Sequence, residues 1–193
     1  MASIYMRIDG VDVKGGATVE GLDGTGWFAV NSYSWGGVRN VAMDIGNGNN
    51  ADSGMVAMSE VNITKQTDGA SEDLLSYLFN PGKEGKTVEI AFTKPESDGS
   101  GAKLYFQVKL SNARLVSYNV SGTDGSQPYE SISFSYVEIS QKHNYELIGG
   151  EVKEGGIVTY NLPQGKLLSG AKYAHNLGVF VSKTPQATIF ISN

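Results

Sequence analysis

Apolar and polar residues alternate along several short stretches of the chain, which is the pattern of half-buried β-strands. In residues 102–110 the even positions from Leu104 onward are apolar, and the odd positions carry lysine, tyrosine and glutamine. The same period of two predicts further strands at residues 4–8, 27–35, 56–65, 86–93, 113–121 and 130–140. Asp-Gly pairs such as Asp9-Gly10 and Asp124-Gly125 supply turns. Short strands at regular spacing favour a barrel or a sandwich.

One segment has the helical period instead. Residues 71–79 (SEDLLSYLF) place apolar side chains at 74, 75, 78 and 79. Ser71 is predicted to be the N-cap, and Pro81-Gly82 is predicted to stop the helix. The sequence therefore predicts a mainly β protein with one short α-helix that flanks the sheet.

Two regions differ from this strand pattern. Residues 40–54 (NVAMDIGNGNNADSG) are rich in glycine and asparagine and are predicted to form a long mobile loop. After about Asn144, paired glycines precede short β-prone pieces at 157–160, 179–182 and 188–191. We therefore divide the chain into a β-domain, residues 1–143, and a C-terminal extension, residues 144–193.

Composition excludes several kinds of chemistry. The 193 residues include 15 Lys plus Arg against 20 Asp plus Glu, and the net charge of −5 argues against nucleic-acid binding. The absence of cysteine excludes disulfides and thiolate metal sites, and only two histidines are present. We expect no metal and no cofactor.

No arrangement of candidate catalytic residues emerges. Glu130 and Glu138 are predicted to lie on one solvated strand face, roughly 26 Å apart at about 3.3 Å per residue, too far to act as a carboxylate pair. His143 and His175 have no neighbouring nucleophile motif. The sequence thus predicts a protein that is not an enzyme.

The start of the chain, MASIYMRIDG, has neither a basic region nor an apolar run typical of a signal peptide. No apolar stretch reaches the length of a membrane span. We expect synthesis in the cytoplasm and no membrane insertion. Strands 27–35 and 56–65 carry apolar residues on both faces, which favours extra buried surface: a helix packed outside the sheet, neighbouring subunits, or a core between two sheets.

Five pieces of the chain, taken in order, resemble the Hcp family, the haemolysin-coregulated proteins of type VI secretion systems. They are IYMRIDG at 4–10, VNSYSWG at 30–36, VNITKQTD at 61–68 followed by Ala70-Ser71, VSYNVSG at 116–122, and PYESISFSY at 128–136. Together they span most of residues 1–143, and the resemblance does not extend to residues 144–193.

The resemblance implies a small antiparallel β-barrel with one flanking helix. It also implies hexameric rings that stack into a secreted tube, with other copies, a spike protein, a sheath and small effectors as partners. Residues 40–54 correspond to the extended loop that reaches an adjacent subunit or ring. The candidate contact residues are Asp44, Asn47, Asn49, Asn50 and Asp52.

Two other functions remain open at this point. The chain could be an evolved Hcp-like effector with an activity in residues 144–193. It could also be a monomeric β-sandwich that binds carbohydrate through Trp27, Trp35 and the asparagine-rich loop. The mass of the protein in solution separates a ring from a monomer.

Overall fold

The computed structural model describes residues 3–11, 13, 17, 21–22, 24–43, 50–95 and 101–169, with the backbone alone at 41–43 and 50–54. Its elements are β1 (Ser3–Ile8), β2 (Phe28–Val30), β3 (Ser32–Ser34), β4 (Gly37–Met43), β5 (Asn50–Met58), β6 (Val61–Gln66), α1 (Ser71–Phe79), β7 (Lys86–Pro95), β8 (Ala102–Ser121), β9 (Tyr129–Ser135), β10 (Glu138–His143), β11 (Tyr145–Glu146), β12 (Val152–Lys153), β13 (Ile157–Asn161) and β14 (Lys166–Leu167).

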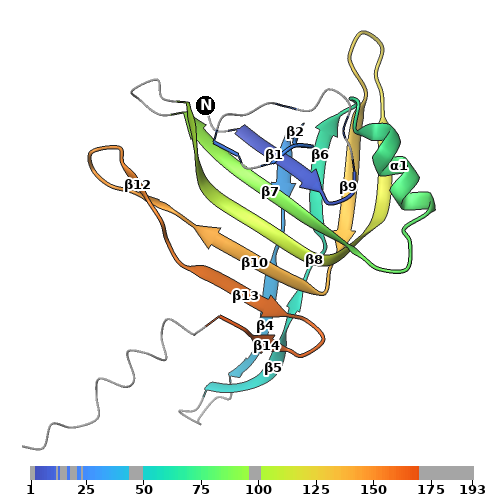
Figure 1. Ribbon diagram of the computed structural model, residues 1–193. Helices are drawn as coiled ribbons and strands as arrows, with labels where there is room; N and C mark the ends of the chain where they lie inside the picture. The colour runs from blue at the N-terminus through green and yellow to red at the C-terminus, as the bar shows by residue number, and fades with distance from the viewer. Residues whose placement is uncertain are drawn as a thin grey trace, which may run out of the picture.

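Ten strands form one sheet with two wings that share β8 (Figure 1). The first wing has the order β14-β13-β10-β8-β7-β1-β2, and the second runs β8-β9-β6-β3. The first part of β8 pairs with β7 and β10, whereas its last part pairs with β9. All of these pairings are antiparallel. A mainly β, antiparallel fold with one short helix confirms the predicted class.

The strand β8 covers two segments that the sequence predicts as separate strands, 102–110 and 113–121. Between them Asn112 has a φ of 50°, a conformation that asparagine tolerates better than most residues. Its Oδ1 accepts a hydrogen bond of 2.7 Å from the Gly85 backbone N–H. A Cβ at Gly85 would lie 2.3 Å from this Oδ1, so the close approach requires glycine. This bend lets one strand serve both wings.

Three other predicted strands are divided in the structure: 27–35, 130–140 and 56–65, the last of which separates into the end of β5 and the start of β6. Residues 27–35 separate at Asn31 into β2, which pairs with β1, and β3, which pairs with β6. The Asn31 N–H donates to the Thr64 carbonyl at 2.8 Å, and Asn31 Oδ1 accepts from the Gln66 N–H at 3.1 Å. Residues 130–140 likewise separate into β9 and β10. The period of two continues across each break, but the inward positions change parity, from Phe28 and Val30 to Tyr33 and Trp35 and from Phe134 and Tyr136 to Ile139.

The predicted inward positions form the core. Val108 and Leu110 of β8 are fully buried, as are Ile63 of β6 and Ile132 and Phe134 of β9. Each such side chain contributes about 1.5–3 kcal/mol by leaving water. The core therefore lies between the two wings and joins them.

The helix α1 has the predicted bounds but a different buried face. Leu74 and Tyr77 are buried, and the Tyr77 hydroxyl donates to the Ala113 carbonyl of β8 at 2.6 Å. The predicted stripe is wrong in part, because Leu75 and Phe79 are exposed. The N-cap residue is Ala70 rather than Ser71, and it makes no side-chain capping bond. Ser71 instead contacts the sheet, as described below.

The prediction of one long loop over residues 40–54 is also wrong. Residues 40–43 end β4, and residues 50–54 begin β5, with Met43 opposite Asn50 and Ala42 opposite Ala51. Glycine and asparagine hide the alternation, and the register shifts between Arg39 and Val41. The candidate contact residues Asn50 and Asp52 lie in β5. Asp44, Asn47 and Asn49 lie outside the described residues.

The beginning of the C-terminal extension continues the first wing. The strand β13 confirms the predicted β-prone piece at 157–160, and it pairs with β10 from Glu138–Asn161 to Lys142–Ile157. The short strand β14 follows at the edge, and β11 pairs with β12 in a separate ribbon. The β-prone pieces at 179–182 and 188–191 lie outside the described residues.

Candidate functional site

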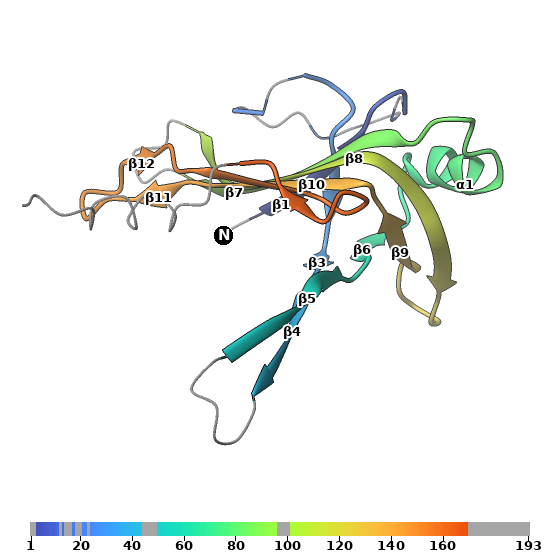
Figure 2. The same ribbon diagram turned by 90° about the horizontal axis from the view of Figure 1, so that it is seen from below.

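The strands β4 and β5 form a two-stranded ribbon that projects away from both wings (Figure 2). Val38 lies opposite Ala57, so Val38, Met55 and Ala57 share one face of this ribbon. All three residues are exposed, Val38 at 65% and Met55 at 76% of the residue surface. The ribbon thus presents an apolar face to solvent.

The base of the β4–β5 ribbon is fixed to the domain by hydrogen bonds. The Trp35 Nε1–H donates to the Tyr136 hydroxyl at 2.5 Å, and this hydroxyl donates to the Ser59 carbonyl at 2.9 Å. The Gly36 N–H donates to Ser59 Oγ at 2.9 Å, and the Ser59 N–H donates to the Gly36 carbonyl at the same distance. These bonds set the direction in which the ribbon leaves the domain.

The outer face of the second wing carries two rows of uncharged polar side chains, which we call the serine–asparagine face. Opposite positions on β3, β6, β9 and β8 give the rows Ser32–Thr64–Ser131–Asn119 and Ser34–Asn62–Ser133–Ser117. Several of these side chains bond across strands. The Ser32 and Thr64 hydroxyls lie 2.6 Å apart, and Ser133 Oγ donates to Asn62 Oδ1 at 2.5 Å.

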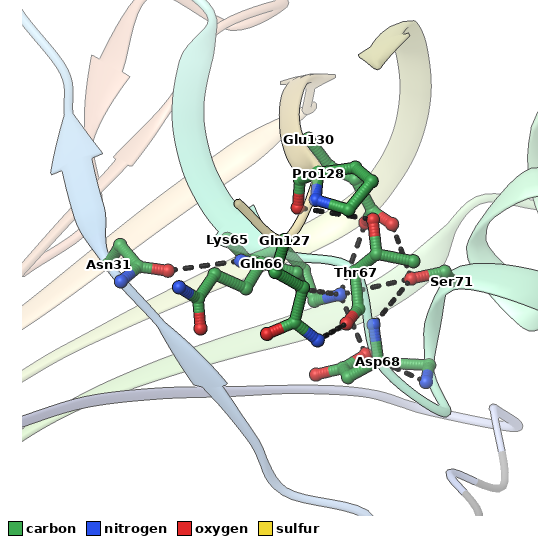
Figure 3. Close-up of polar contacts among 10 residues, drawn as sticks. Asn31, Lys65, Gln66, Thr67, Asp68, Ser71, Gln127, Pro128 and Glu130 are labelled. Atoms are coloured by element: carbon green, nitrogen blue, oxygen red, sulfur yellow. Dashed lines mark hydrogen bonds and ion pairs between the residues drawn. The ribbon is translucent and has the colours of Figure 1, made fainter. Parts of the chain in front are cut away.

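The inner face of the same wing contains a buried ion pair (Figure 3). Lys65 of β6 lies directly opposite Glu130 of β9, and both side chains are 0% exposed. Lys65 Nζ donates to Glu130 Oε2 at 3.1 Å, to Asp68 Oδ1 at 2.7 Å and to the Gln66 carbonyl at 2.8 Å. The phenyl ring of Phe28 lies 5.8 Å from Nζ. The ammonium is therefore well satisfied without water.

The start of α1 is part of this polar cluster. Ser71 Oγ donates to Glu130 Oε1 and accepts from Lys65 Nζ at 3.2 Å. The Asp68 N–H donates to Ser71 Oγ at 3.0 Å, and Asp68 Oδ1 accepts from the Ala70 N–H at 2.9 Å. The cluster joins β6, β9 and α1, and it uses the predicted N-cap serine to hold the helix against the sheet.

The prediction that Glu130 lies on a solvated strand face is wrong, because Glu130 is 1% exposed, and the cluster around it is absent from the predicted site residues. A usable signal was present in the sequence. Glu130 has the same strand parity as Ile132 and Phe134, and Lys65 has the parity of Val61 and Ile63. Two opposite charges at inward positions of different strands indicate a buried pair.

Tyr118 lies partly buried beside the cluster. Burial is the main cause that raises the pKa of its phenol to about 12, followed by hydrogen bonding to Glu130 and the negative charge of Glu130. Tyr33 and Tyr136 also have raised pKa values, mainly through burial. The phenols of these three tyrosines thus favour their neutral form.

Because the folded state holds the Tyr118 proton more tightly than the unfolded chain, its contribution to stability is intact below pH 10 and is lost as the pH rises toward about 12. We expect Tyr118→Phe to reduce the alkaline loss of the free energy of unfolding, measured by urea denaturation across this range. Tyr145→Phe, a change at an exposed tyrosine, is the control and should leave that loss unchanged. An undiminished alkaline loss in Tyr118→Phe would contradict this expectation.

The candidate catalytic and sugar-binding residues have other surroundings in the described part of the chain. Glu130 and Glu138 lie on different strands, and exposed His143 packs against Phe106 with ring centroids 4.6 Å apart. Within the described ranges no group of three potential metal ligands occurs, and no helix is long and apolar enough to cross a membrane. Trp27 is only 3% exposed, so its ring offers no platform for a sugar.

A comparison with protein families matches residues 5–143 to the family described as "Type VI secretion system effector, Hcp". The chain belongs to the Hcp family. The matched region runs from β1 to the end of β10 and includes α1, the β4–β5 ribbon and the Lys65–Glu130 cluster. A search of curated proteins finds no significant match.

Solved structures share this Hcp fold. A type six secretion system protein is 24% identical with a TM-score of 0.73, and the match covers 86% of this chain and 99% of that one. Hcp1 from Salmonella typhimurium is 17% identical, with the same coverage and a TM-score of 0.61. A type VI secretion system effector from Yersinia pestis is 22% identical, covers 82% and 99%, and has a TM-score of 0.54. In the first two comparisons, the matched part of this Hcp chain is longer than residues 5–143, the part that the family comparison matches.

Proposed function

We propose that this Hcp protein is a structural subunit of the inner tube of a type VI secretion system. Its strands form the wall of a small barrel, six copies close into a ring, and rings stack into a tube. The function is assembly, with no catalytic step. The observation that carries the proposal is the projecting β4–β5 ribbon with its exposed apolar face.

A two-stranded ribbon is marginally stable by itself in water, and exposed apolar faces usually mark contact surfaces. Val38, Met55 and Ala57 would leave water if the ribbon lay on an adjacent copy. Such a contact joins two different surfaces of the same chain, and it closes into a ring when the rotation between copies closes. The predicted contact residues Asn50 and Asp52 belong to this ribbon.

The serine–asparagine face suits the wall of a channel. Interfaces between proteins have an apolar centre, and the two rows of this face contain no apolar residue. Its hydroxyls and amides favour hydration over docking. We propose that this face lines the channel, where small effectors pass or are carried.

The partners follow from the same proposal: further copies of the chain, a spike protein, a sheath and small effectors. The protein assembles in the cytoplasm and leaves through the secretion system.

We retain residues 1–143 as the tube domain and residues 144–193 as an extension. Removing everything after His143 would also remove β13, which pairs with β10, so a truncation after Ser169 is the cleaner test of the extension.

The mass of the purified full chain in solution tests the proposal. We expect a species near six times the subunit mass of 20.6 kDa, and rings with an open centre in electron micrographs. A strict monomer at high protein concentration, with no rings in micrographs, would exclude the tube subunit and revive the monomeric binding module.

A further inference from the structure

The strands β6 and β9 pair over six positions, from Val61 opposite Phe134 to Gln66 opposite Tyr129. Their inward positions are apolar except at one place. Val61 and Ile63 on β6 meet Phe134 and Ile132 on β9, and the third inward pair is Lys65 with Glu130. In the described part of the chain, the only other buried polar side chain is Thr93.

Apolar residues alone specify this pairing weakly. A slip of one residue would turn the inward side chains outward, so the alternation excludes it. A slip of two residues keeps every side chain on its own face. Valine, isoleucine and phenylalanine would then exchange partners at modest cost, since cores tolerate apolar exchange that keeps total volume.

The charged pair does not tolerate the same slip. Shifted two residues in one direction, Lys65 would face Ile132; shifted in the other, Glu130 would face Ile63. Either arrangement separates the buried ammonium from the buried carboxylate. Leaving one charge of a buried pair without its partner is strongly destabilising.

The strands next to this pair add no equivalent constraint. On the β8 side, Glu130 lies opposite Val120 and Ile132 opposite Tyr118, and on the β3 side Ile63 lies opposite Tyr33. None of these positions carries a side-chain charge near neutral pH, because valine and isoleucine have no ionisable group and a phenol loses its proton only near pH 10.

We propose that the buried Lys65–Glu130 pair sets the pairing register of β6 and β9. Its value is specificity among registers rather than net stability. Because Asn62 and Thr64 alternate with the inward residues of β6, the same pair aligns them with Ser133 and Ser131. The two rows of the serine–asparagine face therefore depend on a charge pair on the opposite face of the wing.

The chain has no cysteine, so engineered disulfides can report the register directly. Asn62→Cys with Ser133→Cys reports the native register, in which these positions are opposite. Asn62→Cys with Ser131→Cys, and Asn62→Cys with Ser135→Cys, report the two slips of two residues. All of these positions lie on the outer face and are at least partly exposed, so an oxidant reaches them.

The decisive background is Lys65→Met with Glu130→Leu, which removes both charges and leaves apolar side chains of similar size. In the otherwise unmodified chain we expect only the native reporter to cross-link under mild oxidation. In the double variant, judged folded by circular dichroism and a cooperative urea transition, we expect at least one slip reporter to cross-link tenfold more. Native cross-linking alone in the folded double variant would overturn the proposal.

If the double variant does not fold cooperatively, a relocated lysine takes its place. Ile63→Lys with Lys65→Ile moves the ammonium by one inward position while Glu130 is unchanged. We then expect β9 to shift by two residues so that Glu130 lies opposite the new lysine at position 63. The cross-link of Asn62→Cys should move from Ser133→Cys to Ser131→Cys. Retention of the native cross-link, or cross-linking at neither position, would overturn the proposal.

Discussion

Replacing Lys65 by methionine while Glu130 is kept lowers the free energy of unfolding by about 3–5 kcal/mol, the cost of leaving one charge of a buried pair without its partner. The carboxylate of Glu130 would retain Ser71 Oγ but lose the ammonium at 3.1 Å, inside a core where its own exposure is 0%. Asp68 would lose its ion pair with Lys65 as well. Urea denaturation at neutral pH measures the loss.

The matched control is Lys83→Met, the same substitution at an exposed lysine. A surface change of this kind alters stability by about 0.5 kcal/mol or less. A loss in Lys65→Met no larger than that in Lys83→Met would mean that Glu130 finds water or another donor, and that the cluster contributes little to holding β6 and β9 together.

If the β4–β5 ribbon makes the proposed contact between copies, placing aspartate at both Val38 and Met55 converts the proposed rings to monomers. Both side chains lie on the exposed apolar face of the β4–β5 ribbon, so a contact there would bury two unpaired carboxylates in each copy. We expect the mass in solution to fall from six times 20.6 kDa to a single subunit. The urea transition of the monomer should keep its slope, since neither residue belongs to the core.

The double change Leu147→Asp with Ile148→Asp, at two exposed apolar residues after β11, is the comparison. It adds the same charge outside the ribbon and should leave the rings intact. Rings that persist in the Val38→Asp/Met55→Asp protein would show that the ribbon does not make the contact between copies.

The alternation of side chains predicts most of this fold because burial of one face is what selects a strand. Residues 102–110 and 4–8 show this directly, and the helix at 71–79 is also where its period places it. Breaks between strands are harder to predict. At Asn31 the chain passes from one wing to the other and is held to β6 by hydrogen bonds of its backbone and its side chain. The inward positions change from Phe28 and Val30 to Tyr33 and Trp35, a shift of parity that is easily mistaken for one strand with apolar residues on both faces.

The site is less predictable than the fold, for two physical reasons. In β4 and β5, glycine, alanine and asparagine give no hydrophobic alternation, so a ribbon stabilised by backbone pairing is not distinguished from a loop. The charges of Lys65 and Glu130 suggest solvent exposure when each is considered alone. The two residues are 65 positions apart in sequence, and only their shared inward parity indicates that they pair. In the folded domain each charge is stabilised by the other in place of water.

The bend at Asn112 gives the domain a single long strand that belongs to both wings. Each wing therefore pairs with its own part of β8, and one continuous backbone connects the two sets of pairings. The connections also have different lengths. The β7–β8 and β8–β9 pairs join neighbouring strands, whereas β6 must find β9 across more than 60 intervening residues. Loop-closure entropy then favours the β7-β8-β9 meander as the early structure in folding, with β6 arriving last on a template already formed.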